Sequence, residues 1–201
     1  MVCDREGYHL LDTQVAPDHV GILISVTPEQ TVSQSVQRLK GNVSRQFSLA
    51  FPKRLTEVRI PTLWARGYFA RSSGTADADT VRAYVDSQIS HHGYRGRWTQ
   101  AMRFQNSNFK SPVFKLAHSL AILQYHLVLV TDSRVPIFDD AMAPRLFDYL
   151  IAVGNKRGFA LDRLSVLPDH IHLVVEAPPS LSAMALALSI FNNTRYWLEK
   201  N

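Results

Sequence analysis

Residues 168–175 read PDHIHLVV, a Pro-Asp turn followed by a short apolar run that carries two histidines. The β-branched residues behind Pro-Asp predict a buried strand over residues 171–175. Because side chains alternate between the two faces of a strand, His170 and His172 lie on the same face, with Cβ atoms roughly 7 Å apart. Two imidazoles so placed could share one divalent cation. The same sequence also fits two half-buried histidines with a structural role. For an isolated His-x-His pattern, a structural role is more common than metal binding.

The same Pro-Asp-His core occurs 151 residues earlier, at His19 instead of His170. Residues 7–26 read GYHLLDTQVAPDHVGILISV, and residues 158–177 read GFALDRLSVLPDHIHLVVEA. In both copies a proline-containing break follows, and then a helical stretch that ends in Ser/Thr-Arg. Few letters are identical, and Gly21 stands where the second copy has a histidine, but the order of elements is shared. This pattern indicates a degenerate internal repeat.

Hydrophobic periodicity predicts the other elements. The expected strands are residues 20–26, 120–130 and 160–166, and residues 63–71 are expected to be strand or extended chain. The expected helices are 32–51, 81–89 and 140–157, the last closed by Gly158. The C-terminal half therefore follows a β-α-β-β-α order, which is most of a ferredoxin-like, split βαβ unit with an antiparallel sheet in an α+β fold. Together with the repeat, this order predicts a pseudo-dimeric or permuted chain, with a partial unit over 1–90, a basic linker over 91–112 and a second partial unit over 113–201.

The charge distribution indicates a nucleic-acid partner. The 201 residues hold 22 Lys plus Arg against 17 Asp plus Glu, which gives a formal charge of +5 and a pI near 9.5. Residues 87–131 contain no acidic side chain and interleave basic with aromatic residues, which suits single-stranded nucleic acid. A solvated basic face is the plainer alternative. The expected phosphate contacts are Arg38, Lys40, Arg45, Arg95 and Arg97.

Cysteine content and hydropathy narrow the cellular setting. Cys3 is the only cysteine, so an internal disulfide and a cysteine-rich zinc site are excluded, and a reducing, cytoplasmic setting fits best. The first ten residues have no apolar core, and the most apolar stretch, residues 116–130, is interrupted by polar side chains. We therefore expect a soluble cytoplasmic protein with no signal peptide and no membrane partner.

A second set of candidate residues lies on the expected helix 81–89. Tyr84 and Gln88 are four residues apart, so they share one helix face. The phenol could act as a nucleophile, and the amide oxygen could join a metal site. The same side chains could instead form the packed side of an amphipathic helix, and taken alone that interpretation is the more common one. Three further histidines have no spacing partner and are expected to be surface or half-buried residues: His91, His92 and His126.

Several of these motifs together resemble one protein family. The strand PDHIHLVV, residues 60–74 (IPTLWARGYFARSSG) and the helix 81–88 (VRAYVDSQ) look like the single-tyrosine HUH transposases of IS200/605-type insertion sequences, over nearly the whole chain except the linker. The resemblance implies an enzyme that cuts and rejoins single-stranded DNA, at hairpin-forming element ends, through a 5′-phosphotyrosine. It also implies that Tyr84 is the nucleophile. The implied ligands of Mg²⁺ or Mn²⁺ are His170, His172 and Gln88. A phenol with a pKa of about 10 needs such a metal, which polarises the phosphate.

The chain departs from the family pattern in the order of its motifs. In the family the histidine pair precedes the tyrosine helix, whereas Tyr84 here precedes His170, and ahead of it stands only His19-x-Gly21. In one interpretation, Tyr84 and Gln88 complete the His170 site, within one chain or across a homodimer. In another, the chain is a decayed or domesticated fusion that binds DNA without cutting it. A third interpretation, from a different class, is a ferredoxin-like RNA-binding module that needs no metal.

Overall fold

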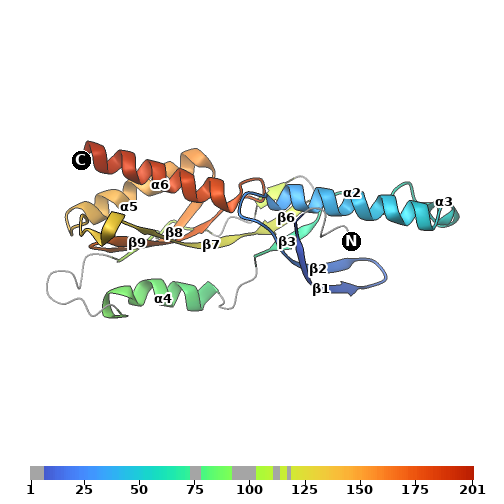
Figure 1. Cartoon of the computed structure of the whole chain (residues 1–201), viewed down its shortest axis with the longest axis horizontal. Coiled ribbons are helices and arrows are strands. Elements are labelled where there is room, and N and C mark those ends of the chain that lie inside the picture. The colour runs from blue at the N-terminus through green and yellow to red at the C-terminus, as the bar shows by residue number, and fades with distance from the viewer. Residues whose placement is uncertain (1–6, 73–77, 92–102, 111–113, 117–118) are drawn as a thin grey trace.

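The chain folds into an elongated molecule, with an N-terminal hairpin toward one end and the main sheet toward the other (Figure 1). The computed structural model describes residues 7–72, 78–91, 103–110, 114–116 and 119–201. Helices and mostly antiparallel strands occur in both parts, so the fold combines α and β structure as expected. No helix within the described ranges is long and apolar enough to cross a bilayer.

Strand β9 lies at the centre of the main sheet, and all of its residues are buried. The sheet has the order β4-β8-β9-β7, and each neighbouring pair is antiparallel. A strand with a partner on both sides and both faces covered suits a run that is apolar except for His172, so the buried strand predicted over residues 171–175 is confirmed. The elements of this part are β4 (Arg103–Gln105), β7 (Gln124–Val130), the 3-10 helix η2 (Asp132–Arg134), α5 (Met142–Arg157), β8 (Ala160–Leu167), β9 (His170–Glu176) and α6 (Ala183–Lys200).

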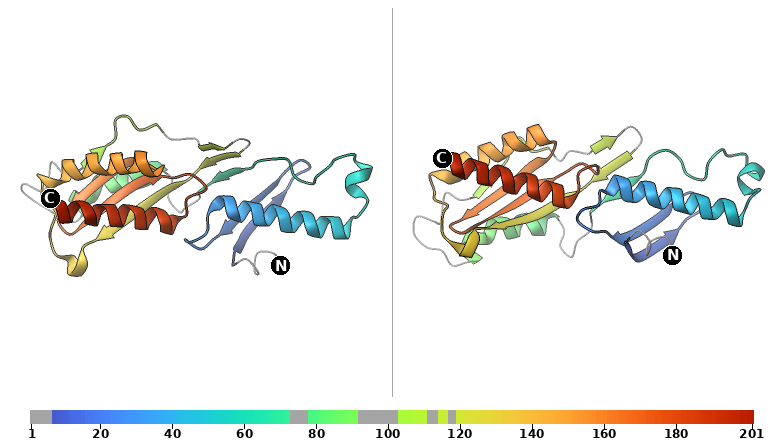
Figure 2. Two further views of the ribbon diagram at one scale, coloured as in Figure 1. Left: turned by 90° about the horizontal axis from the view of Figure 1, so that it is seen from above. Right: turned by 45° about the horizontal axis from the view of Figure 1, so that its top comes forward.

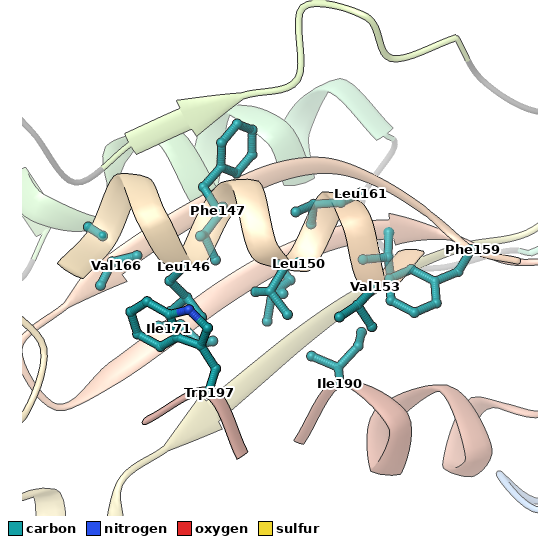
Figure 3. Packing of buried hydrophobic residues seen from close by; sticks show 14 of the residues in the cluster. Leu146, Phe147, Leu150, Val153, Phe159, Leu161, Val166, Ile171, Ile190 and Trp197 are labelled. Carbon is teal, nitrogen blue, oxygen red and sulfur yellow. The ribbon is translucent and has the colours of Figure 1, made fainter. Parts of the chain in front are cut away.

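Helices α5 and α6 cover one face of the main sheet (Figure 1). Helix α5 ends at Gly158, whose φ of 81° is the left-handed conformation that glycine adopts without strain, so the predicted end of this helix is confirmed. Ile171 of β9 belongs to one buried apolar cluster with Leu146 of α5 and Trp197 of α6 (Figure 3). Because Ile171 faces these helices, the residues on either side of it face the opposite side of the sheet.

Helix α4 (Ala78–His91) packs on that opposite side (Figures 1 and 2). It contacts β8 and β9, and Val85 at its centre is fully buried. The helix predicted over residues 81–89 is therefore confirmed. By its place in the sequence α4 belongs to the first predicted unit, but its packing partners belong to the second.

The N-terminal part is a two-stranded hairpin beside one long helix. The helix begins at a capping box on Thr31, and the prediction of a helix over residues 32–51 is confirmed. The strand predicted over residues 20–26 forms, but the prediction that it is buried is wrong, because most of its side chains are exposed. Its elements are β1 (His9–Val15), β2 (Val20–Ser25), α2 (Val32–Ala50) and the short helix α3 (Arg54–Glu57).

The small size of this part explains the exposed strand. Strands β1 and β2 pair only with each other within the described residues, and the hairpin therefore lacks the neighbouring strands that β9 has. The buried cluster consists of Tyr8 and Leu39, with Ile24 and Val26 packed against it. An apolar strand in a two-stranded sheet is buried only where such a helix covers it.

Three short strands join the two parts in the order β3-β6-β5, with β3 parallel to β6: β3 (Phe69–Arg71), β5 (Phe114–Leu116) and β6 (Ser119–Ile122). Of residues 63–71, expected to be strand or extended chain, only Phe69–Arg71 form a strand. The strand expected over residues 120–130 is divided at Leu123, whose carbonyl accepts a hydrogen bond from Ala177. The expected linker 91–112 contains β4, which pairs with β8 and so extends the main sheet.

The substitution Gly154→Ala tests the packing of α5. An added Cβ would lie 2.7 Å from the backbone oxygen of Phe159 and 3.1 Å from its ring, and a backbone atom cannot move aside easily. We expect a free energy of unfolding lower by about 1–3 kcal/mol in a urea titration. Gly41→Ala in α2 is the matched control, because its Cβ would meet no atom within 4 Å and alanine favours a helix by roughly 0.5–1 kcal/mol. Equal stability of the two variants would contradict the close packing at Gly154.

Candidate active site

His170 and His172 lie on the face of β9 that α4 covers. His172 is opposite Val128 of β7 and Ser165 of β8, so it stands in the middle of the sheet. Both histidines are only 4% exposed, because they occupy a central strand beneath a helix. The centroids of their rings are 5.1 Å apart. This is the same-face arrangement that the strand pattern predicts.

Helix α4 brings Tyr84 to the same place. The centroid of its ring lies 5.9 Å from that of His172 and 5.7 Å from that of His126, and both contacts are edge-on. The side chain is 42% exposed, so a substrate can reach it from solvent. The contact forms within one chain, although the tyrosine precedes these histidines in the sequence.

Two crossed ion pairs join α4 to β8. Arg82 Nε donates to Asp162 Oδ2 at 2.6 Å, and Arg163 donates to Asp86. Arg82 and Asp86 are one helical turn apart, and their partners are adjacent at a β-bulge that begins after Leu161. Because a bulge places two residues of one strand opposite a single residue of the next, it lets two consecutive side chains reach α4. The hydrogen bond to Asp162 raises the pKa of Arg82 above its usual value.

Asp169 orients the ring of His170. Its Oδ1 accepts a hydrogen bond from His170 Nδ1 at 2.5 Å, and its Oδ2 accepts one from Arg134 at 3.3 Å. Burial alone would raise the pKa of Asp169, but the hydrogen bonds from His170 and Arg134 outweigh it and lower the pKa below its usual value. The ionised carboxylate holds the proton of the imidazole on Nδ1. His170 would therefore bind a cation through Nε2.

His126, expected to be a surface or half-buried histidine without a spacing partner, is exposed and lies beside His172. Its Nε2 lies 3.0 Å from Nδ1 of His172, and the two rings are stacked with centroids 5.3 Å apart. The two residues lie on neighbouring strands, where His126 is opposite Val174, the next residue but one after His172. Spacing within one segment cannot reveal such a diagonal contact across a sheet. Desolvation lowers the pKa of His126 below its usual value.

The two strand histidines are the residues on this face that could share a divalent cation. Each ring has its Nδ1 held by a neighbour, Asp169 for His170 and His126 for His172, so that Nε2 is the atom on each ring that would bind the ion. Gln88 lies one turn after Tyr84 on α4, but its side chain lies outside the described residues. Within the described part of the chain, no three His, Cys, Asp or Glu side chains form a group that could hold a metal ion.

The expected phosphate contacts lie in different surroundings. Arg38 and Arg45 are exposed on α2. The ammonium of Lys40 donates to the backbone oxygens of Ala65 and Gly67, at 2.8 and 2.9 Å, and so ties the segment before β3 to the helix. The remaining two, Arg95 and Arg97, lie outside the described residues. A DNA contact by any of the five stays a prediction.

The first Pro-Asp-His core does not form a comparable site. His19 bonds Asp18 at 2.8 Å, much as His170 bonds Asp169, but its side chain is 68% exposed. Gly21 takes the position of the second histidine. The first core therefore keeps one oriented imidazole and lacks the pair.

Comparison with protein families identifies the chain. A family model described as "Transposase IS200 like" matches residues 1–88 and 119–201, which is most of the sequence. The chain belongs to the IS200-like transposase family. The two matched blocks are separated by residues 89–118, which include the linker expected over residues 91–112.

Individual relatives of this IS200-like chain match over shorter regions. It is 28% identical over 87 residues to the ISDra2 transposase TnpA of Deinococcus radiodurans, covering 43% of this chain and 62% of that protein. It is 25% identical over 88 residues to the transposase for insertion sequence element IS200 of Salmonella typhimurium, covering 44% of this chain and 57% of the relative. The matches thus span less than two thirds of these relatives. A crystal structure of a protein assigned as a transposase from Deinococcus radiodurans is similar with a TM-score of 0.37 and 24% identity, over 47% of this chain and 68% of that one.

Proposed function

We propose that this chain cuts and rejoins single-stranded DNA during DNA transposition, through a 5′-phosphotyrosine on Tyr84. One observation carries the proposal. The phenol lies against His172, with 5.9 Å between ring centroids, within a single chain in which the motif order is reversed. In a fusion that had lost its activity, selection would not preserve a half-exposed tyrosine beside a buried pair of histidines. A family of transposases supports the same class of reaction.

In this proposal His170 and His172, together with Gln88, hold Mg²⁺ or Mn²⁺. Such an ion, when bound, polarises a non-bridging phosphate oxygen and stabilises the charge that develops there. Asp169 and His126 keep the two rings in place, and α4 holds the phenol beside them. The phosphate would enter from the exposed side of Tyr84, where the ring is accessible to solvent.

The reaction exchanges one phosphodiester bond for another. Tyr84 Oη forms a bond to phosphorus and releases its proton, the bond from phosphorus to the 3′ oxygen breaks, and that oxygen takes up a proton to become a 3′-hydroxyl. One proton is released and one is consumed, so the step balances. Attack of a 3′-hydroxyl on the phosphotyrosine reverses the step and rejoins DNA without another energy source.

The same proposal includes the fold: a fusion of two ferredoxin-like, split βαβ units. In the second unit, α5 connects β7 to β8, and β9 lies between these two strands and runs antiparallel to both, as a split βαβ requires. The repeat is supported element by element at the offset of 151 residues. Strands β1 and β2 correspond to β8 and β9, and α2 corresponds to α6. Even the register irregularities correspond, after Leu10 in one unit and after Leu161 in the other.

The helix starts support the repeat independently. Thr31 accepts a hydrogen bond from the backbone of Gln34 at 3.2 Å, and Ser182, 151 residues later, accepts one from Ala185 at the same distance. The two caps also face each other. Ser33, two residues after the first cap, donates its backbone amide to the carbonyl of Pro179 at 2.9 Å. Met184, two residues after the second cap, donates in the same way to the carbonyl of Pro28 at 2.9 Å. Reciprocal contacts of this kind are the pattern of a two-fold interface.

This arrangement implies one active site per chain. The second unit has the histidine pair and receives α4 from the first unit. The first unit has Gly21 in place of a ligand, and within the described residues its hairpin has no counterpart of β7 and is not covered by a helix like α4. A monomer would therefore be sufficient for cleavage, and a homodimer is not required to complete the site.

A covalent-adduct assay tests the proposed function. The probe is a set of single-stranded oligonucleotides that tile the DNA on both sides of the gene for this chain, labelled at the 5′ or at the 3′ end and incubated with Mn²⁺. We expect an adduct that survives denaturation and carries only the 3′ label, since the downstream fragment is joined through its 5′ phosphate. The 5′-labelled fragment should be released with a 3′-hydroxyl. No adduct with any oligonucleotide would overturn the proposal in favour of a DNA-binding relative.

A further inference from the structure

We infer that His126 is a positioning residue that fixes the tautomer and orientation of His172. The inference rests on the proposed function, in which His172 is a metal ligand. It is carried by the 3.0 Å contact between His126 Nε2 and His172 Nδ1 and by the stacking of the two rings, whose planes differ by 16°. This contact joins two strands, so the backbone hydrogen bonds between β7 and β9 hold it in place.

The chemistry of the contact determines where each proton lies. A neutral imidazole has one nitrogen that donates and one that accepts. If His172 binds a cation through Nε2, its proton is on Nδ1 and is donated to His126 Nε2. The proton of His126 then lies on its own Nδ1. His126 thus does for His172 what the carboxylate of Asp169 does for His170.

The same geometry separates this role from that of a third ligand. A cation bound to His126 Nε2 would need the lone pair that accepts the proton from His172. His126 is therefore expected to act on the metal site only through its neighbour. Contacts of this indirect kind typically change metal affinity by about 10–100-fold when they are removed.

The first unit offers an internal comparison. It keeps the pair formed by Asp18 and His19, which corresponds to Asp169 and His170. Strand β7, which carries His126, has no counterpart beside β2 within the described residues. In that unit the position equivalent to His172 is Gly21. Within the described residues, the first unit therefore lacks counterparts of both His126 and His172. It keeps His19, the counterpart of His170, beside its carboxylate.

Two measurements on the full chain test this inference, both at pH 8, where imidazoles are mostly neutral. The first is the tautomer of His172 in the metal-free protein, read from two-bond ¹H–¹⁵N spectra of the histidine rings. We expect the Nδ1–H form in the natural chain and its loss in His126→Ala. The second is Mn²⁺ affinity, measured by the electron paramagnetic resonance signal of free Mn²⁺. We expect His126→Ala to weaken binding by about 10–100-fold.

Two control variants make the outcome specific. In His126→Gln, the amide oxygen can take the place of Nε2 as an acceptor, so both the tautomer and most of the Mn²⁺ affinity should be restored. His19→Ala, at an exposed histidine of the first unit, should change neither. An Nε2–H tautomer of His172 in the natural chain, or Mn²⁺ affinity unchanged in His126→Ala, would overturn the inference. Failure of the natural chain to bind Mn²⁺ would instead count against the proposed metal-dependent function, and the tautomer would still decide the role of His126.

Discussion

Tyr84→Phe is expected to abolish the covalent protein–DNA adduct completely. The substitution removes only the hydroxyl that, in the proposed function, forms the bond to phosphorus, and phenylalanine keeps the ring that lies edge-on to His126 and His172. Because the side chain is partly exposed, the free energy of unfolding should change by less than about 0.5 kcal/mol. Adduct formation with 3′-labelled DNA and a urea titration measure the two quantities on the same preparation.

A second tyrosine serves as the matched control. Tyr196 lies on α6, is exposed and approaches Lys200, so Tyr196→Phe should retain the adduct. An adduct that persists in Tyr84→Phe would show that another tyrosine is the nucleophile, and the next candidates by sequence are Tyr94, Tyr68 and Tyr196.

Mixing two inactive variants tests whether the site forms within one chain. His170→Ala keeps Tyr84 but lacks one of the proposed metal ligands, and Tyr84→Phe keeps both strand histidines. If α4 serves the histidines of its own chain, the mixture should form no adduct. If α4 is exchanged between two copies, the tyrosine of one variant would meet the histidines of the other, and activity would return in the mixture. Recovery of the adduct would therefore contradict the single-chain site.

Local sequence patterns were sufficient for most elements of the main sheet. Residues 171–175 are apolar except for His172, and a short run of this kind after a Pro-Asp turn indicates a buried strand whatever its partners are. Helix α5 has both its periodicity and its terminal Gly158, which are properties of neighbouring residues. The same pattern failed for β2, because within the described residues this strand pairs only with β1 and lacks the neighbours that β9 has.

The candidate site was predictable where its residues are close in sequence. His170 and His172 alternate on one strand, and Tyr84 and Gln88 are one turn apart on a helix. Their meeting could be proposed only from the family resemblance, since no local pattern connects α4 to β9. His126 was missed because its partner lies diagonally across the sheet. The bulge after Leu161, which directs two side chains of β8 to α4, was missed for the same reason.

Arg82→Met is expected to release α4 from the sheet. The substitution leaves Asp162, only 4% exposed, without the guanidinium that neutralises it. Removing one partner of a buried ion pair typically costs about 3–5 kcal/mol, and we expect the lower value because Arg82 is partly exposed. A cost of about 3 kcal/mol corresponds to an opening of α4 that is more frequent by about two orders of magnitude. Hydrogen exchange of the amides of residues 81–87 measures this opening.

The double variant Arg82→Met with Asp162→Leu separates charge from packing. When both partners of a buried pair become apolar, the remaining cost is small or absent, so exchange at α4 should return toward that of the natural chain. Exchange in α5 is the internal reference, since α5 covers the face of the sheet opposite to α4. If the single variant left exchange at α4 unchanged, the ion pair with Asp162 would not hold the helix.

The docked fraction of α4 should also determine how much covalent adduct forms. In the single variant, adduct formation should fall in proportion to the docked fraction of α4, and in the double variant it should recover with that fraction, because Tyr84 reaches the histidines only when the helix is in place. In this mechanism Arg82 acts only through the docking of α4, so loss of activity without increased exchange at α4 would contradict it. Under the proposed function, Tyr84 and the histidines of β9 come from segments far apart in the sequence, and the ion pairs between α4 and β8 would hold them together.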